Sequence, residues 1–191
     1  AGVAAGFFSL RHPHVPLVLT LQEGDEERHL RRYTFGSSVL YRLLIRPWHY
    51  LPFYRADYMT AISSALKERA ARVVPDCPTA VVPNGVDTSL FHPRPGQASP
   101  DELRNRLGIH PRNTVLVTAS RLVTKNGIGD AVHALCHLAD NTTLLIVGDG
   151  PLREQLIREA TADGVRSRVV FAGEVPHVDL PAYLSLGDVF V

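Results

Sequence analysis

The chain has 191 residues, 45% of them hydrophobic, which is enough for one large domain or two small ones with a sizeable core. A net charge of +1 gives no general case for nucleic-acid binding, and no apolar run is long enough for a transmembrane helix. The two cysteines, Cys77 and Cys136, lie far apart without metal-ligand spacing, which indicates reduced thiols in a cytosolic protein.

The two ends of the chain suggest a fragment. There is no initiator methionine and no basic leader of the kind that opens a signal peptide. The chain begins in a helix-like stretch and stops within a predicted strand at 188–191. We therefore expect a longer parent protein.

Short apolar runs alternate with helix-like stretches in the first half of the chain. The pattern predicts a helix over 1–12, strands over 15–21, 56–62 and 79–82, and a helix over 64–73 that Ser63 caps. The run 15–21 is nearly continuous in apolar residues, which is typical of buried parallel strands, and 56–62 is interpreted as another buried strand.

Residues 28–50 form a basic, aromatic-rich stretch with five arginines and no carboxylate. Val39, Leu43 and Leu44 fall on one face of a helix there. One interpretation is a surface that meets anionic lipid or a phosphate-bearing acceptor, at the inner face of the membrane. The other is a helix packed in the core whose arginines extend to solvent.

A linker is predicted at 92–99, where proline and glycine are frequent. It divides the chain into residues 1–93 and 94–191. Ser99 and Glu102 then form a capping box, and Gly108 closes the short helix that follows.

The second half alternates strands and helices regularly. We expect strands at 114–119, 143–147, 168–171 and 188–191, and helices at 127–139, 151–162 and 179–186. Such alternation predicts an α/β fold with a parallel sheet and helices on both faces.

Arg121 and Lys125 follow directly after the apolar strand that contains 115–117, just as an amphipathic helix begins. Open parallel sheets bind ligands at this edge. Two cations beside a helix amino-terminus would stabilise a pyrophosphate. The alternative is that both are solvated loop charges.

Two glycine turns follow later strands. Gly148 and Gly150 open a helix at Pro151, but the third glycine of the dinucleotide fingerprint is missing, which weakens an NAD hypothesis. A plain turn would explain them equally well. Gly173 ends the next strand and would let a planar base approach the backbone closely; a turn that needs a small residue is the alternative.

Three segments carry a family resemblance, namely SRLVTKNGIGDAVHAL, LLIVGDGPLREQL and VVFAGEVPHVDLPAYLSLGDVFV. In order and spacing they resemble the donor-binding half of retaining glycosyltransferases of the glycogen-synthase-like superfamily, also called group 1 or family 4. The resemblance implies two Rossmann-like domains, the GT-B fold, both incomplete here. It also implies transfer of a hexose from a UDP- or GDP-sugar to a hydroxyl acceptor, with retention and with neither metal nor other cofactor.

The resemblance also assigns roles to residues. It implies that Arg121 and Lys125 hold the donor diphosphate, although the family's lysine usually stands at the place of Asn126. It implies that the turn of Gly148 and Gly150 lines the donor cleft. The loop of Gly173, Glu174 and Val175 would hold the nucleobase.

Cleft contacts are also expected from the first domain. Gln22 and Glu23 lie in a turn where the family often carries a histidine; Gln22 cannot titrate but could bind a sugar hydroxyl. Asn84 and Gly85 belong to a PNGVD turn that marks the rim of the cleft in the family. Asn-Gly is also common in ordinary tight turns.

The family's pair of glutamates, eight residues apart, is expected after Val191, so we expect the fragment alone to be inactive. Its parent would act in polysaccharide or glycolipid synthesis, on an acceptor that could be lipid-linked. Two alternatives stay open. One is a non-catalytic GT-B-like binding module, and the other is a nucleotide-sugar 2-epimerase of the same fold.

Overall fold

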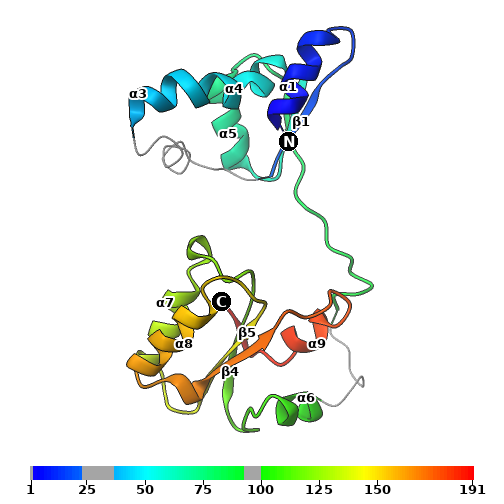
Figure 1. The fold of residues 1–191 in the computed structure, drawn as a ribbon. Coiled ribbons are helices and arrows are strands. Elements are labelled where there is room, and N and C mark those ends of the chain that lie inside the picture. Colours follow the sequence, from blue (N-terminus) through cyan, green and yellow to red (C-terminus); the bar gives the residue numbers. More distant parts are fainter. Residues whose placement is uncertain (1, 23–36, 93–99) are drawn as a thin grey trace. The chain divides into compact units, whose positions relative to one another are not determined.

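The computed structural model describes residues 2–22, 37–92 and 100–191, which form two compact units, Ala1–Gly85 and Val86–Val191. Figure 1 shows both units with their elements labelled. The units part earlier than the boundary after residue 93 that the linker composition suggested. Phe91 explains this, because its ring lies 5.1 Å from the ring of His177 in the second unit.

The first unit contains a parallel sheet with strand order β1-β2-β3 among the residues described. Its strands are β1 (Val18–Leu21), β2 (Tyr58–Ala61) and β3 (Thr79–Val81). Its helices are α1 (Gly2–Arg11), α3 (Ser38–Leu40), a π-helical turn (Tyr41–Ile45), α4 (Arg46–Arg55) and α5 (Ser64–Val73).

Strand β1 is shorter and more exposed than the sequence suggested. It begins at Val18 rather than residue 15, and Val18 is 59% exposed. Leu17 instead exchanges hydrogen bonds with Asp57, in the loop before β2. Because β1 pairs only with β2 among the described strands, it lies at the sheet edge, and the expectation of a buried strand was wrong.

Strand β2 and helix α5 agree better with the predictions from the sequence. Met59 and Ala61 of β2 are completely buried. The Ser63 hydroxyl accepts a hydrogen bond from the Leu66 amide at 3.3 Å, and α5 begins at the next residue, as predicted.

Helices α1 and α4 pack closely. A Cβ added to Gly6 would lie 2.9 Å from the Leu51 side chain, so only glycine allows this approach. The Arg55 guanidinium donates to the Ser9 carbonyl at 3.2 Å, which ties the two helices together.

The second unit contains a parallel sheet with strand order β6-β5-β4-β7 among the residues described. Its strands are β4 (Thr114–Ala119), β5 (Thr142–Val147), β6 (Val169–Gly173) and β7 (Val189–Phe190). Its helices are α6 (Pro100–Arg106), α7 (Ile128–Ala134), α8 (Arg153–Ala162) and α9 (Leu180–Leu184), with 3-10 turns at Thr124–Asn126, Leu135–His137 and Arg166–Arg168.

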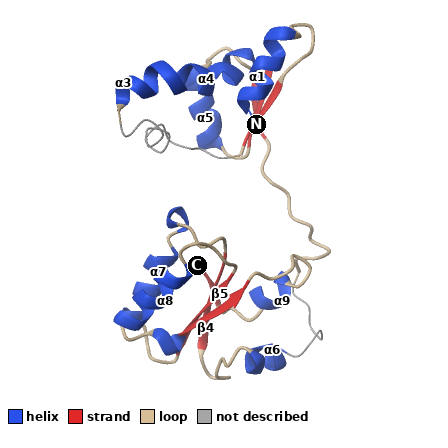
Figure 2. Ribbon diagram, in the orientation of Figure 1, coloured by secondary structure: helices blue, strands red, loops and turns tan. Residues whose placement is uncertain are grey.

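Apolar clusters cover both faces of this sheet. Leu144 and Ile146 of β5 pack in a cluster with residues of α7 and α8, while Leu145 and Val147 pack in one with residues of α6 and α9. Figure 2 shows these helix pairs on opposite sides of β4 and β5. All of β5 is buried. The predicted α/β fold with a doubly covered parallel sheet is confirmed.

Helix ends in this unit depend on glycine and arginine. Gly108, with φ +68°, closes α6, as predicted, and the Ile109 amide bonds to the Arg104 carbonyl at 2.9 Å. Ser99 of the expected capping box lies outside the described residues. Helix α7 ends at Ala134 and continues as the 3-10 turn Leu135–His137, so the helical stretch stops before the predicted residue 139. The backbone is extended at Leu138, whose carbonyl accepts from Arg168.

A first prediction concerns the core of the second unit. Val115 is fully buried, whereas Val178 is 66% exposed. Val115→Ala deletes two buried methyl groups, each worth about 0.8 kcal/mol, and leaves a cavity, so we expect a loss of about 2 kcal/mol. Urea denaturation followed by circular dichroism measures it. Val178→Ala is the matched control, and equal losses in both variants would contradict the assignment of the core.

Candidate functional site

The segments that follow β4 and β5 remain paired beyond the sheet. The Ser120 amide bonds to the Val147 carbonyl at 3.0 Å, and the Leu122 amide bonds to the Asp149 carbonyl at the same distance. The two loops at the carboxyl edge are therefore held against each other. This is the edge at which open parallel sheets bind ligands.

The glycines of the second loop have a structural role. A Cβ on Gly148, whose φ is +125°, would overlap the Ser120 carbonyl, and a Cβ on Gly150 would lie 2.6 Å from the Leu122 oxygen. Both residues thus allow two backbones to approach directly. Gly148 also donates to the Gly173 carbonyl at 2.7 Å, which joins the exits of β5 and β6.

The loop after β4 directs alternate residues to the core and to solvent. Leu122 is fully buried, and Arg121 next to it is exposed. The Asn126 side chain donates to the Arg121 carbonyl at 2.7 Å and closes the loop. Asn126 therefore fixes the backbone that carries Arg121. Lys125 is exposed in the 3-10 turn that ends at Asn126.

The three residues expected at the β6 exit differ in exposure. Gly173 has φ +76°, and a Cβ there would meet nothing within 4 Å, so space is open beside its backbone. Glu174 is exposed, whereas Val175 is partly buried and packs against the core cluster on the side of α6 and α9. The Val175 side chain is thus partly held by the core, whereas the Glu174 side chain faces solvent.

Two buried polar groups in these loops escaped the sequence analysis. Ser120 Oγ and Arg153 Nε are buried without a hydrogen-bond partner among the described residues. Such a group costs about 1–3 kcal/mol unless something pairs with it. The Arg153 guanidinium also lies 5.9 Å from the Phe171 ring centre. In the sequence, Ser120 stands next to Arg121 and Arg153 stands two residues after Pro151, and this proximity to the predicted site was what could have pointed to them.

Potential metal ligands are placed elsewhere. Within residues 2–22, 37–92 and 100–191, a group of three His, Cys or acidic side chains lies close enough together to hold a metal ion. This group lies outside the Arg121 loop and outside both glycine turns. The groups at the carboxyl edge are the exposed cations Arg121 and Lys125, the carboxylates of Asp149 and Glu174, and the backbone of the glycine turns.

Two family models together match nearly the whole chain. The model described as "Glycosyltransferase Family 4" matches residues 1–90, and "Glycosyl transferases group 1" matches residues 99–191. The chain belongs to the group 1 glycosyltransferases.

Relatives of this glycosyltransferase chain also carry glycosyltransferase names. A GDP-mannose-dependent alpha-(1-6)-phosphatidylinositol monomannoside mannosyltransferase of Mycobacterium tuberculosis is 38% identical over 75% of this chain and 40% of that protein. The putative teichuronic acid biosynthesis glycosyltransferase TuaC of Bacillus subtilis is 27% identical over 93% of this chain and 40% of its own length. The chain thus spans 40% of the length of these relatives.

Solved structures show the GT-B fold. HepE of Anabaena, solved with UDP-glucose, matches with a TM-score of 0.79 and 24% identity over 99% of this chain and 49% of that one. WaaG, a glycosyltransferase involved in lipopolysaccharide biosynthesis, matches with a TM-score of 0.66 and 20% identity over 96% and 54%.

The candidate residues of the first unit of this glycosyltransferase lie at one edge of its own sheet. Gln22 follows β1, and Asn84 and Gly85 lie in the loop after β3; all are exposed. Because these strands are parallel, their loops leave from the same edge. Glu23 lies outside the described residues.

Asp87, the last residue of the PNGVD turn, belongs to the second unit. Its carboxylate accepts hydrogen bonds from the Ser89 hydroxyl at 2.6 Å and the Ser89 amide at 2.8 Å. These bonds hold the pKa of the Asp87 carboxyl below its usual value. The turn is thus followed by a locally fixed segment.

A second prediction tests the packing of the two loops. Gly150→Ala places a methyl group against the Leu122 backbone, so we expect a loss of about 1–3 kcal/mol in unfolding free energy and a displaced Arg121 loop. Thermal unfolding and amide hydrogen exchange of residues 120–122 measure both. Gly85→Ala meets nothing within 4 Å and is the control. Unchanged exchange in Gly150→Ala would contradict the packing.

Proposed function

We propose that the second unit binds the diphosphate of a nucleotide sugar at the carboxyl edge of its sheet, with Arg121 as the principal contact. One observation carries this proposal. The loop after β4 is held on the glycine turn after β5, with Leu122 buried and Arg121 exposed where the exits of β4, β5 and β6 meet. The position and the charge both suit a pyrophosphate.

Each part of this edge has a role in the proposed reaction. Arg121, assisted by Lys125, stabilises the negative charge that develops on the nucleoside diphosphate as its bond to the sugar breaks. The turn of Gly148 and Gly150 lines the cleft. Backbone groups at Gly173 and Val175, with the exposed Glu174, contact the nucleobase. In this proposal cations take the place of a metal ion.

The protein that contains this chain would transfer a hexose with retention of configuration. The donor phosphate itself would take the proton of the attacking hydroxyl, so that no side chain need act as a general base. The name of the mycobacterial relative specifies GDP-mannose as donor and a phosphatidylinositol monomannoside as acceptor. We therefore propose a GDP-hexose donor, with a UDP-hexose as the alternative, and a lipid-linked hydroxyl acceptor in glycolipid or polysaccharide synthesis.

A third prediction tests the role of Arg121. A hydrogen bond to a charged partner is worth about 1.5–3 kcal/mol, so Arg121→Ala should weaken nucleoside diphosphate binding at least about tenfold. Calorimetric titration of the chain with GDP, and separately with UDP, measures the affinity. Arg158, an exposed arginine of α8, provides the matched control Arg158→Ala. Equal affinities in the two variants would contradict the proposal.

The helical stretch from Ser38 to Arg55 also has an exposed apolar face. Val39, Leu43 and Leu44 are 63%, 67% and 60% exposed, so the interpretation of a core-packed helix is wrong for these three side chains. Arg42 and Arg46 lie among them, and residues 37–56 contain no carboxylate. No helix in the described part of the chain could cross a membrane. We propose that this surface contacts anionic lipid at the cytoplasmic face, where a lipid-linked acceptor would be reached.

A fourth prediction concerns this surface. A basic residue near an anionic membrane contributes about 1 kcal/mol, so Arg42→Gln should weaken vesicle binding about fivefold. Co-sedimentation with phosphatidylcholine vesicles, with and without phosphatidylglycerol, measures the binding. Arg158→Gln controls for net charge. If wild-type protein binds both vesicles equally, or Arg42→Gln binds like the control, the surface does not recognise anionic lipid.

A further inference from the structure

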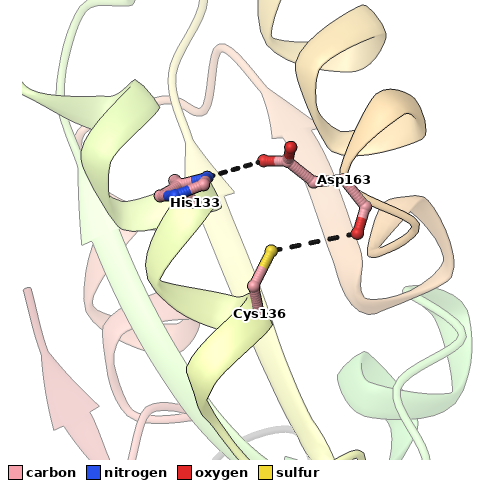
Figure 3. Close-up of side chains that lie close together, drawn as sticks. All are labelled: His133, Cys136 and Asp163. Carbon is pink, nitrogen blue, oxygen red and sulfur yellow. Dashed lines mark hydrogen bonds and ion pairs between the residues drawn. The ribbon is translucent and has the colours of Figure 1, made fainter.

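Three side chains of different chemistry meet where two helices of the second unit end. They are His133 in α7, Cys136 in the 3-10 turn that follows it, and Asp163 at the carboxyl end of α8. One potential ligand atom from each lies within 4.8 Å of the others. Figure 3 shows the His133 ring directed at the Asp163 carboxylate and the Cys136 sulfur at the Asp163 carbonyl.

Local structure brings these groups together. His133 and Cys136 are three residues apart on consecutive helical turns, which places them on one face. Gly164, with φ +71°, ends α8, and the Val165 amide bonds to the Ala160 carbonyl at 2.9 Å. This closure fixes the backbone of Asp163 beside the end of α7.

The donor set suits zinc. Imidazole nitrogen, thiolate sulfur and carboxylate oxygen are all zinc ligands, at about 2.0–2.3 Å from the metal, so tetrahedral ligands lie roughly 3.3–3.8 Å apart. Here His133 Nδ1 and Asp163 Oδ2 are 3.0 Å apart. The three ligand atoms lie within 4.8 Å of one another, so side-chain rotations that turn the Cys136 sulfur toward the other two would complete the site. A water molecule would supply the fourth ligand.

The position of Asp163 also favours a cation. It occupies the cap position at the carboxyl end of the ten-residue helix α8, where the helix dipole disfavours an anion. A metal ion between Asp163 and Cys136 would place a positive charge at this helix end, where the dipole favours it. The charges of one carboxylate and one thiolate would balance those of a divalent ion.

We propose that His133, Cys136 and Asp163 bind a zinc ion that joins the ends of α7 and α8. Both helices begin at the carboxyl edge of the sheet and run back, so the metal lies at the opposite edge from Arg121. It is a structural site, separate from the proposed transfer reaction. The exposed His133 side chain leaves the site open to metal from solution.

The affinity of the site for zinc depends on pH, because metal binding releases a proton. Zinc takes the place of the Cys136 thiol proton, which goes to solvent. In a neutral His133 ring the proton moves from Nδ1 to Nε2, so that Nδ1 can bind the metal. Because ligands bind in their deprotonated forms, affinity falls as the pH falls.

Cobalt titration tests the proposal. The chain is stripped with EDTA and titrated with Co²⁺, whose bond to a thiolate gives a charge-transfer absorption band in the near ultraviolet. We expect one ion per chain, displacement by Zn²⁺, and a melting temperature that rises when Zn²⁺ is added. Cys136→Ser should abolish the band. Asp163→Asn should weaken binding at least about tenfold, since even changes outside the ligand shell cost that much.

Cys77→Ser is the matched control. Burial, with the nearby Asp57 charge, raises the pKa of the Cys77 thiol and disfavours its thiolate, and Cys77 lies in the first unit. This variant should keep the band. A wild-type chain without the band, or a band that persists in Cys136→Ser, would overturn the proposal. Arg121→Ala should bind cobalt normally, so this test is independent of the donor site.

Discussion

The close approach of two backbones at the carboxyl edge of the second sheet is the constraint on which the candidate site depends. Ser120 and Leu122 lie against Gly148 and Gly150, with no room for a Cβ on either glycine. Because the Leu122 side chain is fixed in the core, its neighbour Arg121 is directed outward. The same glycine turn continues to the β6 exit through Gly173. One steric requirement thus places the cation, the turn and the third loop together.

The fold of the second unit could be predicted well because its signals are local. Strand β5 is buried on both faces, and its residues 144–147 form an unbroken apolar run. Gly108 ends α6 through its own backbone conformation. In the first unit the same reasoning overestimated burial. An apolar run such as 15–21 cannot reveal how many neighbours its strand will have. Strand β1 has one neighbour among the described strands, so Val18 remains exposed.

The part of the candidate site that depends on the order of strands along the chain could be predicted. The exits of parallel strands meet at one edge, so Arg121, Gly148 and Gly173 could be grouped before their contacts were known. The amide of Asn126 on the Arg121 carbonyl, and the burial of Ser120 Oγ, depend on packing and could not be predicted. The structure also gives Asn126 a role of its own where the resemblance had indicated only a displaced lysine.

The two edges of the second sheet differ in what holds them together, and this difference follows from the direction of its helices. At the carboxyl edge, backbone hydrogen bonds and glycine packing fix the loops, which leaves charged side chains exposed for a ligand. At the amino edge, side chains hold the ends of α7 and α8, through the contacts of Asp163 with His133 and Cys136. Cys136 and Asp163 are far apart in sequence, so only the packing of α7 on α8 could reveal them as partners.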